Sequence, residues 1–170
     1  KIIKSNGEVL MNLINDILDI SIIEAGQLKI KSKAFRLTEL LNELLFFFNQ
    51  EIEKLGKSPL TLTADYDNLC EDLVIMTDMI RLRQILSNLL WNALKFTCSG
   101  QITLGYRLSG IEEVIFFVKD TGTGIKPEHH KLIFERFSKF NTATSGPLQA
   151  GTGLGLAICH ELVSALGAQA

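Results

Sequence analysis

Two asparagines and a lysine are spaced so that they share one face of an expected helix. Asn88, Asn92 and Lys95 stand at positions i, i+4 and i+7, and at 100° per residue these positions line up on consecutive turns. Asparagine is only a middling helix former, so this face either meets solvent or lines a polar site. In a polar site, a carboxamide oxygen suits Mg²⁺, and a lysine one turn further on can meet a phosphate.

Two glycine-rich segments follow along the chain. Asp120 comes directly after an apolar run and precedes Gly122 and Gly124. This arrangement lets the backbone approach a ligand closely, although a tight turn alone also uses glycine. Residues 151–156 lead into an expected helix, where free N–H groups and the helix dipole favour an anion. The segment does not fit a dinucleotide-binding loop, because Leu156 stands where the third glycine belongs, and the chain contains no Walker A sequence.

The elements that must position these residues alternate between helix and strand. Asp78 is placed to cap a helix over residues 79–96, because its carboxylate can accept from the unpaired N–H groups of the first turn. Residues 35–45 indicate a helix, or a strand and then a helix with Thr38 as its cap, running into an aromatic triplet at 46–48 that is expected in the core. We expect strands at residues 60–64, 73–76, 101–108 and 114–118, and a last helix at 153–166. This order is typical of an α/β or α+β domain.

The first 30 residues carry an apolar stripe at helical spacing, with Gly26 as the expected stop. A helix of about 26 residues is roughly 40 Å long, which is more than one small domain covers. The stripe also nearly fits a heptad repeat. We therefore favour a helical bundle or a dimer seam over packing on the chain's own domain.

Composition and charge exclude several classes of protein. The 170 residues are 46% hydrophobic and 21% charged, which excludes a disordered tail, and no apolar stretch reaches the roughly 18 residues of a membrane span. A net charge of −2 without a basic stripe argues against a nucleic-acid partner, and we expect no membrane contact. Three cysteines without Cys-Xaa-Xaa-Cys spacing indicate reduced thiols, as in the cytoplasm.

The sequence resembles the sensor histidine kinases. Residues 85–97 look like the N box of that family, 120–125 like the G1 box, 133–137 like the F box and 151–156 like the G2 box. Residues 13–26 are similar to the second helix of the family's dimerisation and phosphotransfer hairpin. Four boxes in this order are highly specific, and the resemblance covers nearly the whole chain.

The resemblance implies a fold and a division of the chain. Residues 1–30 would be part of the dimerisation and phosphotransfer helix, and residues 31–170 the ATP-binding catalytic domain, with its C-terminal hairpin missing. The implied fold is a two-layer α/β sandwich, with a mixed sheet and helices on one face, preceded by a long bundle-forming helix. Residues 126–150 would form a mobile lid.

The resemblance also implies a site for ATP and Mg²⁺. Asn92 would hold the metal with Asn88 assisting, Lys95 would neutralise phosphate charge, and Asp120 would accept a hydrogen bond from the adenine amino group. The implied nucleotide-binding set is Asn88, Asn92, Lys95, Phe96, Asp120, Gly122, Gly124, Ile125, Phe137, Gly151, Thr152, Gly153, Leu154, Gly155 and Leu156, with Asn92 as the metal ligand.

The implied activity is transfer of the ATP γ-phosphoryl group to a histidine on a dimerisation helix outside these residues, so we expect no self-phosphorylation. Kinase chemistry is preferred over hydrolysis, because Asn88 stands where hydrolytic members of the superfamily carry a glutamate base. His129, His130 and His160 are expected to be solvated or packed. The implied partners are a second subunit, bound through the N-terminal helix, and the receiver domain of a response regulator. The alternatives are a docking domain of the same fold that has lost nucleotide binding, and a hydrolytic ATPase.

Overall fold

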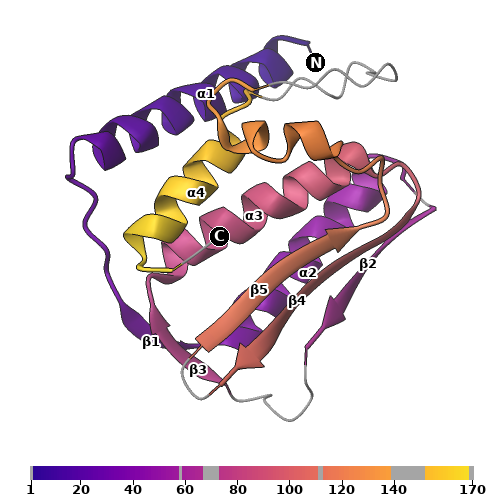
Figure 1. Ribbon diagram of the computed structural model, residues 1–170. Coiled ribbons are helices and arrows are strands. Elements are labelled where there is room, and N and C mark those ends of the chain that lie inside the picture. Colours follow the sequence, from indigo (N-terminus) through magenta and orange to yellow (C-terminus); the bar gives the residue numbers. More distant parts are fainter. Residues whose placement is uncertain (1, 58, 67–72, 111–112, 139–151, 169–170) are drawn as a thin grey trace. The chain divides into compact units, whose positions relative to one another are not determined.

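The structure, a computed structural model, describes residues 2–57, 59–66, 73–110, 113–138 and 152–168. These residues fall into two compact units, one made of residues 1–31 with 127–170 and the other of residues 32–126. Figure 1 labels the elements, which are α1 (Ile2–Glu24), β1 (Lys33–Arg36), α2 (Leu37–Lys54), β2 (Leu60–Asp65), β3 (Val74–Thr77), α3 (Met79–Phe96), β4 (Gly100–Ser109), β5 (Glu113–Asp120) and α4 (Gly155–Ala165).

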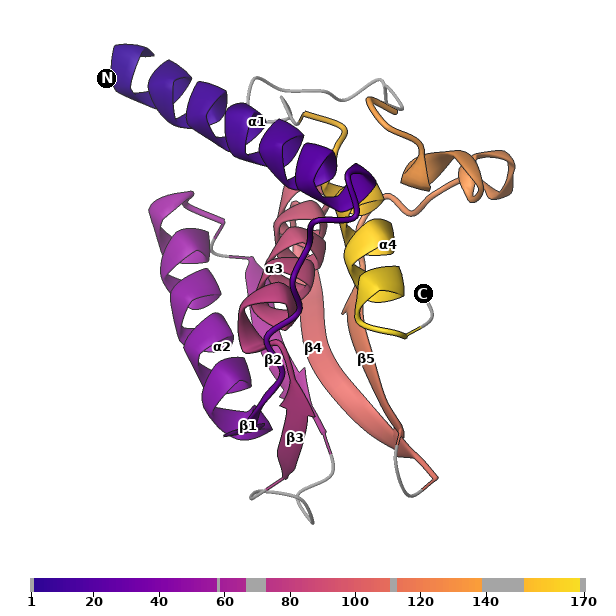
Figure 2. The ribbon, with the colours of Figure 1, turned by 90° about the vertical axis from the view of Figure 1, so that its left-hand side faces the viewer.

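The unit of residues 32–126 contains two sheets. The larger has the order β2-β4-β5, with β2 parallel to β4 and β4 antiparallel to β5, so it is mixed as expected. In the smaller sheet, β1 pairs with β3 in antiparallel fashion. Helices α2 and α3 lie side by side on one face of the larger sheet (Figure 2). The expected α/β class is confirmed, although the strands form two sheets where the sequence suggested one.

An apolar core lies between the helices and the larger sheet. Every second residue of β4 faces it, and Ile102, Leu104 and Tyr106 are at most 1% exposed. Leu41 of α2 and Leu86 of α3 are wholly buried against these strands. Burial of this apolar surface is the main force that fixes α3 on the sheet.

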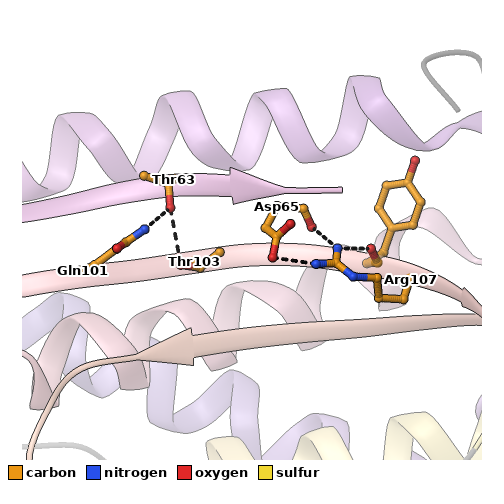
Figure 3. Close-up of polar contacts among 6 residues, drawn as sticks. Thr63, Asp65, Gln101, Thr103 and Arg107 are labelled. Carbon is orange, nitrogen blue, oxygen red and sulfur yellow. Dashed lines mark hydrogen bonds and ion pairs between the residues drawn. The ribbon is translucent and has the colours of Figure 1, made fainter. Parts of the chain in front are cut away.

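The outer face of the same sheet is polar along β2 and β4, because the alternate residues of β4 point away from the helices. Figure 3 shows the contacts that pair β2 with β4 on this face. The Thr63 hydroxyl lies 3.3 Å from that of Thr103 and accepts from the Gln101 amide at 2.8 Å. Asp65 forms an ion pair with Arg107 at 2.7 Å. Polar pairs of this kind leave the outer face compatible with water.

The start of α3 is set by a side-chain cap, as predicted. Oδ1 of Asp78 accepts from the N–H groups of Ile80 at 3.1 Å and Arg81 at 3.2 Å. The start of α2 differs from the prediction, because α2 follows β1 directly and its N-cap position is Arg36, without a side-chain cap bond. Thr38 therefore lies inside the helix and is not its cap.

The aromatic triplet at the middle of α2 is only partly in the core. Phe48 is 2% exposed, but Phe46 is 68% and Phe47 is 45% exposed. Consecutive helical residues point about 100° apart, so a helix on one face of a sheet buries only one of three neighbours. The prediction that all three belong to the core is wrong. Trp91 of α3, itself exposed, packs edge-to-face on Phe48 with ring centroids 5.1 Å apart.

The other unit contains α1 and α4, which contact each other. Ile20 of α1 is buried, whereas Leu10 and Ile17 are exposed. The helix ends at Glu24, and Gly26 follows with φ +64°, in agreement with the expected stop. No helix in the described part of the chain is long and apolar enough to cross a membrane. The domain boundary expected near residue 30 stays a prediction.

Candidate functional site

The polar face of α3 is as expected from the spacing of its residues. Asn88, Asn92 and Lys95 are all half-buried, whereas Leu86 and Leu90 on the core face of the helix are at most 1% exposed. The Lys95 ammonium lies 4.9 Å from the centroid of the Phe96 ring, within the range of a cation–π contact. These side chains are therefore partly sheltered, which a purely solvated face would not require.

The end of α3 meets the loop that follows β5. The Thr123 N–H donates to the Phe96 carbonyl at 3.4 Å, and the hydroxyl of Thr97 donates to Oδ1 of Asp120, also at 3.4 Å. The Gly122 N–H donates to the same Oδ1 at 2.8 Å. The structure thus brings the N-box and G1-box residues of one unit together, and Asp120 remains exposed at the end of β5.

The glycines of this loop have a structural reason. A Cβ at Gly122 would lie 2.5 Å from the Phe96 carbonyl oxygen and 2.8 Å from Oδ1 of Asp120, which no side chain tolerates. Gly124 has φ +67°, a conformation that favours glycine. The exposed Ile125 follows. The tight-turn interpretation is therefore correct at both glycines, and the turn is what presents Asp120.

The remaining candidate residues lie in the other unit, around the start of α4. Thr152 donates to Oδ2 of Asp16 at 3.0 Å and accepts from the Leu154 N–H at 3.2 Å. A Cβ at Gly153 would lie 2.9 Å from the backbone of Phe137, so these two residues are neighbours.

The start of α4 carries no side-chain cap, because Leu154 occupies the N-cap position. Leu154 is wholly buried, while Gly155 and Leu156 of the first turn are half-buried. Gly151 lies outside the described residues, as do residues 139–150 of the expected lid. Earlier parts of that lid form short 3₁₀ helices at Pro127–His129 and Leu132–Phe134.

The candidate residues therefore form two groups, each within one unit. The first, called the α3 half-site, contains Asn88, Asn92, Lys95, Phe96, Asp120, Gly122, Gly124 and Ile125. The second, called the α4 half-site, contains Phe137, Thr152, Gly153, Leu154, Gly155 and Leu156.

Two residues next to the α3 half-site were given no role from the sequence, although Thr97 ends the stretch 85–97 that resembles the N box. Thr97 is wholly buried and touches Asp120. Lys57 donates from Nζ to the carbonyls of Leu94 at 2.5 Å and Thr97 at 3.0 Å. A polar residue directly after a helix was the available signal for Thr97. Nothing in the spacing of Lys57 indicates its role, because β2 and β4 bring it to α3 from forty residues away.

The histidines and the polar contacts of the α4 half-site's unit are mostly at its surface. Nε2 of His129 lies 3.7 Å from Glu128, and exposed His160 packs against Phe134 with ring centroids 5.6 Å apart. Arg136 forms an ion pair with Glu24 of α1 at 2.5 Å. The expectation that His129 and His160 are packed or solvated agrees with these positions.

Residues 77–170 match a family model described as histidine kinase-, DNA gyrase B-, and HSP90-like ATPase. The chain is 40% identical over 168 residues to the circadian input-output histidine kinase CikA of Synechococcus elongatus, covering 98% of this chain and 22% of that protein. It is 36% identical over 168 residues to the autoinducer 2 sensor kinase/phosphatase LuxQ of Vibrio cholerae, covering 97% of this chain and 19% of that protein. The chain thus spans about a fifth of the length of these relatives.

Solved structures of histidine kinases are also similar. Full-length ShkA in complex with AMPPNP aligns with a TM-score of 0.80 at 29% identity, covering 96% of this chain and 32% of that one. The histidine kinase ThkA in complex with the response regulator protein TrrA aligns with a TM-score of 0.70 at 26% identity, covering 98% of this chain and 43% of that one. The similarity extends over nearly all of this chain in both.

Proposed function

The chain belongs to the family of histidine kinase-, DNA gyrase B- and HSP90-like ATPases, and from this premise we propose that it binds ATP·Mg²⁺ for phosphoryl transfer to a histidine. It is the ATP-binding catalytic domain of a sensor histidine kinase, as the named kinases to which it is similar indicate. Within a kinase of this kind, the domain holds the nucleotide and the acceptor histidine is supplied by the phosphotransfer helix.

The environment of Asp120 is the observation that supports nucleotide binding best. Gly122 and Thr97 both donate to Oδ1, and among the residues that the structure describes nothing donates to Oδ2. A held, exposed carboxylate oxygen suits the amino group of adenine, and it discriminates against guanine, which presents a carbonyl there. Gly122, Gly124 and Ile125 form the turn that carries this carboxylate.

The α3 face supports a role at the metal and the phosphates. The half-buried Asn92 offers a neutral amide oxygen of the kind that Mg²⁺ accepts, with Asn88 one turn before it. Lys95, one turn after, supplies a positive charge for phosphate oxygens, and Phe96 shelters it. When bound, Mg²⁺ would neutralise phosphate charge and orient the leaving group.

The α4 half-site supports a role at the outer phosphates. Gly153, with φ +76°, and Gly155 place backbone N–H groups at the start of a helix, where an anion is favoured. We assign Gly151, Thr152, Leu154, Leu156 and the exposed Phe137 to the same nucleotide contact. With these residues, the proposed nucleotide-binding set is complete.

Transfer to histidine, not hydrolysis, is the proposed reaction. A water molecule needs a base to attack the γ-phosphorus, and the neutral amide at Asn88 cannot act as one. Transfer to a positioned imidazole relies on orientation and on electrostatic stabilisation of the phosphoryl group, and the amides and the ammonium of the α3 face are suited to that role.

We propose a second subunit and a receiver domain as protein partners. The apolar residues Leu10, Ile14 and Leu18 of α1 are between 42% and 58% exposed, which suits a helix that packs in a dimer. The ThkA structure contains a response regulator, and we extend that partner class to this chain. ATP as substrate and the exposed thiol of Cys98 suit a cytoplasmic setting.

Calorimetric titration of the 170-residue chain with ADP and Mg²⁺ tests the proposal. We expect saturable heat that depends on Mg²⁺, and no sustained phosphate release when ATP replaces ADP. A folded chain that gives no heat at millimolar ADP would support the docking-domain alternative, and steady phosphate release would support the hydrolytic one.

A further inference from the structure

We propose that Thr97 is a positioning residue for adenine recognition, with its hydroxyl orienting the Asp120 carboxylate and Lys57 anchoring its backbone. The inference rests on the proposed nucleotide-binding function. It concerns two residues that do not contact the nucleotide in that proposal and that act through Asp120 and the end of α3.

Thr97 uses all of its polar groups at the junction between α3 and the Asp120 loop. Its N–H donates to the Ala93 carbonyl at 3.0 Å and closes the last turn of the helix. Its carbonyl accepts from Nζ of Lys57 at 3.0 Å, and its hydroxyl donates to Oδ1 of Asp120 at 3.4 Å. The residue is wholly buried, so water does not compete for these bonds.

The hydroxyl and the Gly122 N–H select which oxygen of Asp120 meets the base. Both donors reach Oδ1, the amide at 2.8 Å. A single N–H donor leaves the carboxylate more freedom to rotate, whereas a second donor to the same oxygen restricts that rotation. Oδ2 is then presented in one orientation for the adenine amino group. Such pre-organisation lowers the cost of ordering the site when the ligand binds.

Lys57 anchors the backbone at the end of α3. Its ammonium donates to the carbonyls of Leu94 and Thr97, two of the groups that a helix end leaves without intrahelical partners. The lysine is itself held, because its carbonyl accepts from the Leu60 N–H at 2.9 Å where β2 begins. Pro59 is also bonded, because its carbonyl accepts from the Gly100 N–H at 3.0 Å. The end of α3 is thereby joined to the first residues of β2 and β4.

Titration of the 170-residue chain with ADP·Mg²⁺ and with inosine diphosphate·Mg²⁺ tests the inference, because inosine carries a carbonyl in place of the amino group. Thr97→Val removes only the hydroxyl and should weaken ADP binding about three- to tenfold, the value of one hydrogen bond. Inosine diphosphate binding should stay unchanged, so the preference for ADP shrinks. The matched control, Thr97→Ser, keeps the hydroxyl and should retain the wild-type preference. A purely structural role for Thr97 would lower both affinities equally.

Lys57→Met provides a second variant in case Thr97→Val does not fold. It should also reduce the preference for ADP over inosine diphosphate, and Lys57→Arg, which can still donate to the two carbonyls, should restore much of it. Wild-type binding of ADP with an unchanged preference in the folded Val or Met variants would overturn this inference alone. Absence of ADP binding by the folded wild-type chain would overturn the proposed function and the inference with it.

Discussion

The α3 half-site is held by contacts between the end of α3 and the loop after β5, whereas the α4 half-site has a side-chain bond to α1, another helix of its own unit. Asp120 is fixed by a buried threonine and a backbone N–H, on a sheet with an apolar core. By contrast, Thr152 of the α4 half-site is bonded to Asp16 of α1. Arg136, elsewhere in the same unit, is paired with Glu24 of α1. In the proposed function, the residues assigned to the base are therefore positioned by contacts within residues 32–126, whereas Thr152, assigned to the outer phosphates, is positioned by a bond to α1.

The largest effect is expected at Asp120 of the α3 half-site. Asp120→Asn leaves one oxygen to serve both the Oδ1 donors and the adenine amino group, so we expect ADP affinity to fall about 10- to 100-fold, the range for a charge-assisted hydrogen bond. Calorimetric titration measures it. The matched control is Asp65→Asn, at the end of β2 in an exposed ion pair with Arg107 (Figure 3). Equal losses in the two variants would contradict the assignment of Asp120.

The next effect tests whether the polar face of α3 serves the metal. Asn92→Ala removes the amide oxygen proposed for Mg²⁺, and we expect about a tenfold loss of ADP affinity in Mg²⁺, in line with a lost polar contact to a charged group. Without the metal, the variant and the wild type should bind with similar weak affinity. Asn15 is an exposed residue of α1, and the Asn15→Ala variant should bind like the wild type in both conditions. A metal-independent loss at Asn92 would contradict this role.

A smaller effect should appear at the α1 contact of the α4 half-site, as a dependence on pH. Burial raises the pKa of Asp16, the hydrogen bond from Thr152 opposes the rise, and the charge of Asp19 adds to it. A raised carboxyl pKa means that the folded state holds the proton more tightly. The stability that Asp16 contributes is therefore fully present below the ordinary pKa of 3.8 and is lost as the pH rises through the raised pKa.

Asp16→Asn should remove this decline, because the amide oxygen still accepts from Thr152 but carries no charge. Thermal midpoints measured by circular dichroism, from about pH 3.5, near the ordinary carboxyl pKa, up to about pH 7, test this. We expect the variant to gain on the wild type toward neutral pH. Parallel curves for the two proteins would show that Asp16 is not coupled to folding.

The smallest effect is expected at Arg136. Its ion pair with Glu24 is exposed, with 39% and 56% of the two side chains accessible, so Arg136→Gln should cost at most about 1 kcal/mol. The loss in thermal midpoint should vanish in high salt, because salt screens exposed charges. The control is Arg83→Gln, which breaks an ion pair with Glu43 in the other unit and should show the same loss of its effect in high salt. A loss that persists in high salt would show that Arg136 does more than form this pair.

Rules that depend only on neighbouring residues predicted where helices and strands lie. They predicted less well which residues inside a helix cap it or are buried. Asp78 predicted the first residue of α3 because capping depends only on adjacent residues. The alternation over residues 101–108 likewise predicted the strand β4, because the strand period of two depends only on neighbouring residues. Thr38 was wrong as a cap because a capping residue type also occurs inside helices. The aromatic triplet was misjudged because hydrophobicity alone does not say which of three neighbours faces the sheet.

The sequence by itself determined the family and the α/β class and supplied the candidate residues of the two half-sites, because these depend on residue types and short spacings that survive without coordinates. Only the tertiary structure decided which of those residues meet and what holds them. Thr97 and Asp120 are 23 residues apart, and Thr152 and Asp16 are 136 apart. Contacts over such separations depend on strand pairing and helix packing, and no periodicity in the chain carries that information.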